Sequence, residues 1–382
     1  MMLALLVLLT LLVLVLPLLP ALREWQRPSD VVPLKIDEAD ALDPPYLAHS
    51  FAALLADAVQ AGVRHLGGSP MVQVVLGPAP LSHLPLLPAE TLAGRSDRLW
   101  HIEGDVQLPE STHFYAEVSA SEGLHTASHG VYRALWAGGT ATLAAGGTVL
   151  RWAHGRDVNV GTGCHLAGRV TAQHALTLAP GCDFRLLHAQ QIGFVGTDGL
   201  AAVQGPSAAW PCEPMAEWPT VAVWSSAVRR AFARAALQLD AQRSWRGDVV
   251  CLADLVVGPH CQADGSLKAR RSLSVGEGCH VSGTVVAEGA ITLAEGCTVL
   301  GSVLSETAIV VGPGCTIGAP GRLATLTAPL VQIAPGVTVY GTVWAEEIGH
   351  TIDHAVAVAA ESRVDAPVRA RLPAHDTHGV AA

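Results

Sequence analysis

Apolar residues in the C-terminal half of the chain fall in pairs that alternate with polar residues, and the pairs recur every six residues. In residues 273–290, LSVGEGCHVSGTVVAEGA, apolar or small residues occupy positions 1 and 3, 7 and 9, and 13 and 15. Alternation with a period of two is typical of a β-strand with one buried face. Three such pairs in one unit predict a triangular coil with three short strands and three corners.

This 18-residue unit repeats in six consecutive segments over residues 237–348. The fifth unit, which begins at Ile309, carries four additional residues, and the sixth restores the spacing. A second series of units begins at Val158, with a weaker unit before it from Ala141. Repetition of one such unit is typical of a solenoid. The sequence therefore predicts an all-β protein, a triangular parallel β-helix (β-solenoid) in two blocks that form either one interrupted prism or two.

Equivalent positions of successive coils stack on one another, so the repeat predicts which side chains face inward. The predicted core ladder comprises Val257, Val275, Leu293, Val311, Ile333, Val281, Val299, Ile317, Val339, Cys261, Cys279, Cys297 and Cys315. The predicted corner glycines, placed where φ is positive or another coil passes close, are Gly265, Gly283, Gly301 and Gly341. We expect Val299→Asp to unfold the surrounding coils and Thr298→Asp, one residue away and directed outward, to be tolerated.

The segments outside the repeats complete the predicted domain organisation. Residues 45–62 predict a short amphipathic helix before a proline-rich loop, and residues 225–239 place apolar residues on one face of a second helix. The predicted domains are a transmembrane anchor over 1–22, a juxtamembrane helix and proline-rich linker over 23–98, a first solenoid block over 99–195 with looser coils over 99–140, an insertion with the second helix over 196–236, the main solenoid block over 237–348 and a flexible tail over 349–382.

The segment over residues 1–22 carries no charge and is long enough to cross a bilayer as a helix. The first cations, Arg23 and Arg27, follow this segment and none precedes it. The positive-inside rule then predicts a single pass through an inner (cytoplasmic) membrane, with the body of the protein on the cytoplasmic side. A cleaved signal peptide is the alternative, since Pro17 and Pro20 lie near the end of the segment.

Composition narrows the possible partners. The chain has 23 Lys and Arg against 33 Asp and Glu, and the net charge of −10 argues against nucleic acid as a partner. Hydrophobic residues make up 50 % and charged residues 15 %, which excludes a disordered chain and requires a large core. Most of the cysteines recur at the spacing of the repeat unit. That spacing predicts buried free thiols, in agreement with a reducing cytosol.

The sequence carries no recognisable catalytic motif: it lacks GxSxG, a Walker lysine, HExxH and CxxC. Glycine-rich strings such as GEGCHVSG recur with the repeat and open no helix, so they predict corners rather than phosphate loops. His165 and His280 fall at the same outward position of similar coils, which predicts solvent-facing side chains. We therefore predict no catalytic, cofactor-binding or metal-binding residues, no cofactor, and no enzymatic activity.

The strings GCTVLGSVLSE, GCHVSGTVVAE and GVTVYGTVWAE resemble the repeats of the bactofilin, or polymer-forming cytoskeletal, family. The resemblance is best over residues 237–348 and weaker over 141–192. It implies a right-handed β-helix that forms homopolymers through the ends of its solenoid without nucleotide. It also implies a non-enzymatic, membrane-anchored scaffold that positions envelope proteins at the bacterial inner membrane. The chain departs from the family pattern in its length, its insertion and its cysteines.

Two other hypotheses remain open on the sequence alone. Hexapeptide-repeat acyltransferases are similar to this chain in having apolar residues every six positions, and the coils of their left-handed prism have the same length. Such an enzyme requires a catalytic histidine near a groove between coils. No histidine of this sequence can be assigned that role from its position in the repeat. A β-helix exported to the outer side of the membrane is the third hypothesis.

Overall fold

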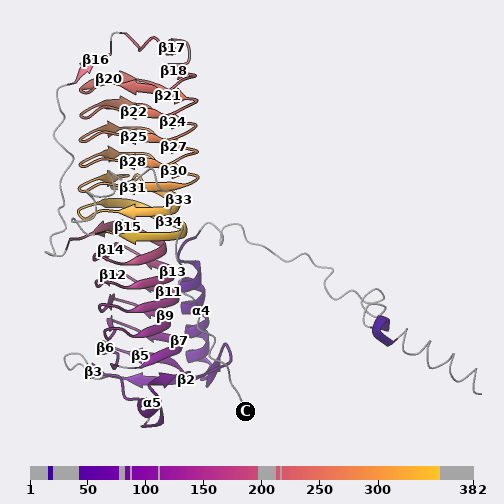
Figure 1. Ribbon diagram of the computed structural model, residues 1–382. Helices are drawn as coiled ribbons and strands as arrows, with labels where there is room; N and C mark the ends of the chain where they lie inside the picture. Colours follow the sequence, from indigo (N-terminus) through magenta and orange to yellow (C-terminus); the bar gives the residue numbers. More distant parts are fainter. Residues whose placement is uncertain are drawn as a thin grey trace, which may run out of the picture. The chain divides into compact units, whose positions relative to one another are not determined.

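The computed structural model describes residues 16–19, 43–76, 82–86, 88–110, 112–196, 212–215 and 217–352. The chain divides into two units, Met1–Asp43 and Pro44–Ala382. The second unit contains a parallel β-solenoid of about 13 turns, with about 18 residues in each coil (Figure 1). This confirms the predicted all-β solenoid and its repeat length.

The predicted anchor over residues 1–22 lies outside the described residues, except for 16–19, where Leu16–Leu18 form a short 3-10 helix. Among the helices that the structure describes, none is both long and apolar enough to cross a membrane.

The strands of the N-terminal block stack as parallel coils, apart from the β1–β2 hairpin. In chain order they are β1 His65–Leu66, β2 Ser69–Val75, β3 Ser82–His83, β4 Arg95–Ser96, β5 Leu99–Glu103, β6 Val106–Gln107, β7 His113–Ala120, β8 Leu124–His125, β9 Val131–Ala137, β10 Thr140–Leu143, β11 Thr148–Gly155, β12 Asp157–Val160, β13 His165–Ala172, β14 Ala175–Leu178 and β15 Asp183–Phe194. Because β2, β3 and β4 already form a coil, the solenoid begins before the predicted boundary at residue 99.

The C-terminal block repeats three short strands per coil. Its strands are β16 Glu213–Pro214, β17 Ala222–Ser225, β18 Arg230–Ala233, β19 Leu237–Leu239, β20 Arg243–Arg246, β21 Asp248–Cys251, β22 Leu255–Val257, β23 Gln262–Asp264, β24 Leu267–Ala269, β25 Leu273–Val275, β26 His280–Val281, β27 Val285–Ala287, β28 Ile291–Leu293, β29 Thr298–Val299, β30 Val303–Ser305, β31 Ala308–Val311, β32 Thr316–Ile317, β33 Ala324–Ile333 and β34 Thr338–Thr351. Leu255 pairs with Leu273, and Leu273 with Ile291, so each strand pairs with its equivalent in the next repeat.

The four additional residues of the fifth unit form a loop that reaches back over the preceding coils. The Arg322 guanidinium donates a hydrogen bond of 2.8 Å to the carbonyl oxygen of Ser282, two coils earlier. Between Arg322 and Ser282 lies the coil that contains Thr298, and the Thr298 side chain is only 8 % exposed. Thr298 is therefore buried and does not face solvent as expected, so we now expect Thr298→Asp to destabilise the coil.

Helix α4, Tyr46–Gln60, confirms the helix predicted over 45–62 and packs along the side of the N-terminal block (Figure 1). Ala48 lies in a buried cluster with Trp152, and the Phe51 and Trp152 rings are 5.3 Å apart. Helix α5, Pro88–Ala93, lies in the segment predicted as a linker, beside the first coil. Side chains of the solenoid that point outward at these places are therefore covered by helix.

The helix predicted over residues 225–239 is wrong. The chain instead makes an antiparallel hairpin of β17 and β18 and continues into β19. The segment also alternates with a period of two, and Ala231 and Ala233 are fully buried. These residues pair with Val249 and Cys251 of the next coil, and this pairing overrides the local helix preference. The predicted insertion therefore supplies strands to the C-terminal block.

The two blocks meet at their last coils, where the direction of the chain reverses. β15 pairs with β34 in antiparallel fashion, from Asp183 opposite His350 to Gly193 opposite Thr338. We call this pairing the tail-to-tail junction. β34 extends to Thr351, past the predicted end of the block at residue 348, and the rest of the predicted tail from residue 353 lies outside the described residues.

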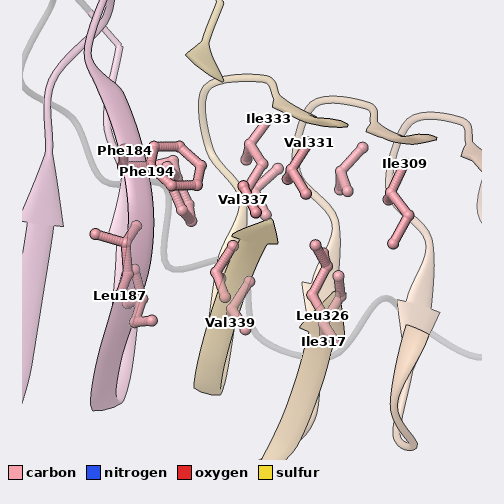
Figure 2. Close-up of a cluster of buried hydrophobic side chains, with 14 of the residues drawn as sticks. Phe184, Leu187, Phe194, Ile309, Ile317, Leu326, Val331, Ile333, Val337 and Val339 are labelled. Atoms are coloured by element: carbon pink, nitrogen blue, oxygen red, sulfur yellow. The ribbon is translucent and has the colours of Figure 1, made fainter. Parts of the chain in front are cut away.

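The core runs through the tail-to-tail junction without a break. Phe184, Leu187 and Phe194 of β15 face Val337 and Val339 from the other block (Figure 2). Buried residues of both blocks belong to one continuous cluster. Of the two arrangements that the sequence left open, the structure therefore shows one prism, assembled from two blocks that run in opposite directions.

Candidate functional site

The predicted core-ladder positions are all buried: every one of these residues is at most 2 % exposed. The predicted corner glycines lie where coils approach each other closely. A Cβ on Gly283 would lie 2.5 Å from the carbonyl group of Gly265 in the preceding coil, and Gly301 stands in the same relation to Gly283. Gly341 has a φ of +125°, a conformation that L side chains rarely adopt.

The cysteines inside the solenoid are free thiols that bridge neighbouring coils. The thiols of Cys279 and Cys297 donate hydrogen bonds of 3.1 Å to the carbonyl oxygens of Gly258 and Gly276. The backbone N–H of Cys261 donates a hydrogen bond of 3.3 Å to the sulfur of Cys279. The neighbouring Cys261 side chain and burial raise the pKa of Cys279. This ladder is part of the packing and lies out of reach of solvent.

Cys212 is the half-buried exception among the cysteines. On the native protein, we expect an aromatic disulfide reagent to label Cys212 rapidly and the other cysteines only after denaturation, because a buried thiol cannot meet the reagent. The Cys212→Ser variant should lose the rapid phase. Rapid labelling of several thiols in that variant would contradict the burial of the ladder.

At the N-terminal end of the solenoid, side chains close the core while the outermost strand keeps one edge open. Glu90 of α5 accepts a hydrogen bond of 2.8 Å from the Ser96 hydroxyl, and the buried Trp100 indole donates to the same hydroxyl oxygen at 2.9 Å. The β1 hairpin covers the start of β2, where the Met71 amide donates a hydrogen bond of 2.8 Å to the carbonyl oxygen of Arg64. Residues 72–75 pair with β5, and no other strand of the described chain pairs with them. Val75 at the end of β2 is 74 % exposed.

The opposite end of the solenoid has the same construction. A stack of Trp218 on Trp224, with ring centroids 5.1 Å apart, packs against Trp245 of the first coil. β17 is the outermost strand here, and within the described chain it pairs only with β18. Val223 on β17 is 70 % exposed. Val75 and Val223 are the two most exposed large hydrophobic residues of the described chain, and they lie on the two terminal strands.

A cavity of about 780 Å³ lies beside the tryptophan stack. Three neighbouring strands, β20, β23 and β26, supply its floor, and its wall is formed by Pro214, Met215, Trp218 and Trp224. The outward residues Gln262 and His280 stand one above the other in successive coils. Asp264 accepts a hydrogen bond of 3.0 Å from the Ser282 hydroxyl on the same floor.

The floor of this cavity carries balanced charge. Arg246 and Asp264 pair across adjacent strands and contribute one charge of each sign. Burial lowers the pKa of His280. The indole nitrogen of Trp245 is buried and has no hydrogen-bond partner among the described residues. The cavity therefore combines aromatic surface with hydrogen-bonding groups, and its lining includes one arginine and one aspartate.

The repeat pattern does not predict this cavity, because its wall comes from a segment with no repeat. His280 was predicted to face solvent, but it is half-buried and lines the cavity. His165 is exposed, as predicted, on β13 in the coil next to the tail-to-tail junction, with Nδ1 3.5 Å from a carboxylate oxygen of Asp183. The only sequence feature that could have indicated the cavity is the stretch with proline and tryptophan before residue 225.

Comparisons with protein-family models, curated proteins and solved structures find no match for the chain.

Proposed function

We propose that this protein is a non-enzymatic scaffold that assembles with itself through the two ends of its solenoid. The observation that carries the proposal is the pair of terminal strands, β2 and β17, each of which has an exposed valine and an edge that no other described strand pairs with beyond the β1 hairpin. Unpaired strand edges are ready templates for pairing with another chain. The caps at both ends close the apolar core but leave these backbone edges available.

The tail-to-tail junction supports the proposal from within the chain. There, the coil ends of two blocks join by antiparallel pairing and share a continuous core. An end-to-end contact between copies would use the same kind of backbone hydrogen bonding between strand edges, at the other end of each block. Contacts at both of these ends would let the assembly extend from copy to copy, as the resemblance to bactofilins also implies.

Lysine at the exposed edge should block assembly. We expect Val223→Lys to prevent contacts through the β17 end, because an added charge at a pairing edge must be desolvated and would repel its symmetry mate. Sedimentation velocity should show a smaller assembly than for the unsubstituted chain, and Val75→Lys combined with Val223→Lys should give single copies. Val256→Lys, at a 41 % exposed outward position in the middle of the block, is the matched control and should assemble normally. Equal assembly by all variants would overturn the proposal.

The membrane anchor and the cytoplasmic, inner-membrane location belong to the same proposal. They are supported by the uncharged segment over residues 1–22 and by the cations that follow it. Assembly of anchored copies would place a scaffold along the membrane, where envelope proteins are its expected partners. Alkaline carbonate extraction should leave the full chain in the membrane fraction and release a chain that lacks residues 1–22. Release of the full chain would contradict the anchor.

A further inference from the structure

We propose that the cavity beside the tryptophan stack binds a neutral oligosaccharide. Its volume of about 780 Å³ is within the range of ligand pockets, about 300–1,000 Å³. A pyranose ring offers an apolar face of C–H groups and a rim of hydroxyls that both donate and accept hydrogen bonds. The cavity offers the matching pair of surfaces, indole rings on its wall and polar side chains on its floor.

The wall suits the apolar face of a sugar. Trp218 and Trp224 are stacked with an interplanar angle of 8°, so they act as one rigid plate. Trp245 meets Trp218 edge-on, with centroids 6.3 Å apart, and holds the plate in place. Both wall tryptophans are only partly buried, which leaves indole surface facing the cavity. Rigid aromatic side chains provide contact area at a low cost in conformational entropy.

The floor suits the hydroxyl rim. Gln262 supplies an amide, Asp264 a carboxylate and Ser282 a hydroxyl, each on the outer surface of adjacent coils. Adjacent coils are about 4.8 Å apart, so donors and acceptors recur at regular intervals along the floor. Arg246 and Asp264 lie opposite each other in the strand register, so the lining offers one positive and one negative charge rather than a cluster of one sign. These features favour an uncharged, hydroxyl-rich ligand over a phosphate or a quaternary ammonium group.

Binding can be measured on the full chain with defined probes. We expect at least one of maltohexaose, cellohexaose and tetra-N-acetylchitotetraose to change the tryptophan fluorescence saturably and to show saturation-transfer signals in NMR. Trp218→Ala and, separately, Gln262→Ala should each weaken that binding by about tenfold or more. Trp344→Ala is the matched control, because Trp344 is 48 % exposed on β34 and does not line the cavity.

Trp218→Ala removes part of the tryptophan stack and can disturb the folding of this end of the solenoid. Gln262 is exposed, so Gln262→Ala tests binding without that disturbance. The circular dichroism spectrum and unfolding midpoint of each variant establish that it is folded. Three results would overturn the proposal: no saturable binding of any of the three sugars, binding that survives the Gln262→Ala substitution unchanged, or tighter binding of tetramethylammonium or inorganic phosphate than of the sugars at the same site. The assembly of the protein is measured separately, so failure here leaves the scaffold proposal standing.

Discussion

Leu293→Asp should unfold the middle of the C-terminal block, with a loss of more than about 4 kcal/mol in the free energy of unfolding. Leu293 is 1 % exposed and pairs with Val275 and Val311 in the coils on either side. The substitution removes a buried aliphatic side chain and places a carboxyl group in a space with no polar partner. Urea unfolding followed by circular dichroism would measure the loss.

Thr292→Asp is the control on the same strand, because Thr292 points outward and is partly exposed. We expect it to change the stability by less than about 1 kcal/mol. Hydrogen exchange should show lost protection in β25, β28 and β31 for Leu293→Asp alone. Solenoid coils contact only their neighbours, so the damage should be local before it spreads. Similar losses for both variants would contradict the assigned strand register.

Gly349→Ala should open the tail-to-tail junction. Gly349 faces Phe184 in the antiparallel pairing, and a Cβ at this position would overlap the buried Phe184 ring. Phe184 is 1 % exposed and cannot swing into solvent without leaving the core. We expect a destabilisation of about 2–3 kcal/mol, together with faster hydrogen exchange in β15 and β34. Differential scanning calorimetry would record the loss of stability.

Gly193→Ala provides the matched substitution at the same junction. A Cβ on Gly193 meets the Thr177 methyl group at 3.9 Å, an ordinary contact. This variant should retain the stability and exchange protection of the unsubstituted chain. If Gly349→Ala were equally benign, Phe184 could not be packed against residue 349 and the antiparallel pairing would be wrong.

The sequence predicts the C-terminal block almost residue by residue, because one repeated unit fixes both the strand positions and their partners. Inward residues such as Val299 and Ile317 follow directly from alternation within the coil. The longer fifth unit was also identified, and Ile309 pairs with Val331, the first residue of the sixth unit. The burial of Thr298 could not be predicted in the same way, because it depends on where the loop of the fifth unit folds.

Features that depend on contacts between distant segments could not be predicted. The hairpin of β17 and β18 replaces a helix because Ala231 finds a partner in Val249 of the next coil. The tail-to-tail junction joins strands that are far apart in the sequence, as the contact between His188 and Thr342 shows, and no local pattern encodes the reversal of direction. The cavity depends on Trp218 and Trp224 lying over coils to which their sequence has no similarity.

Electron microscopy of the second unit, residues 44–382, tests the central claim most directly. Within the part of the chain that the structure describes, β2 and β17 are the terminal strands, and end-to-end contacts through their unpaired edges should produce filaments as the protein concentration is raised. Images should show columns longer than one copy, and these should disappear with Val75→Lys and Val223→Lys together. Single columns of one copy at high concentration, with both ends unsubstituted, would contradict self-assembly through the solenoid ends.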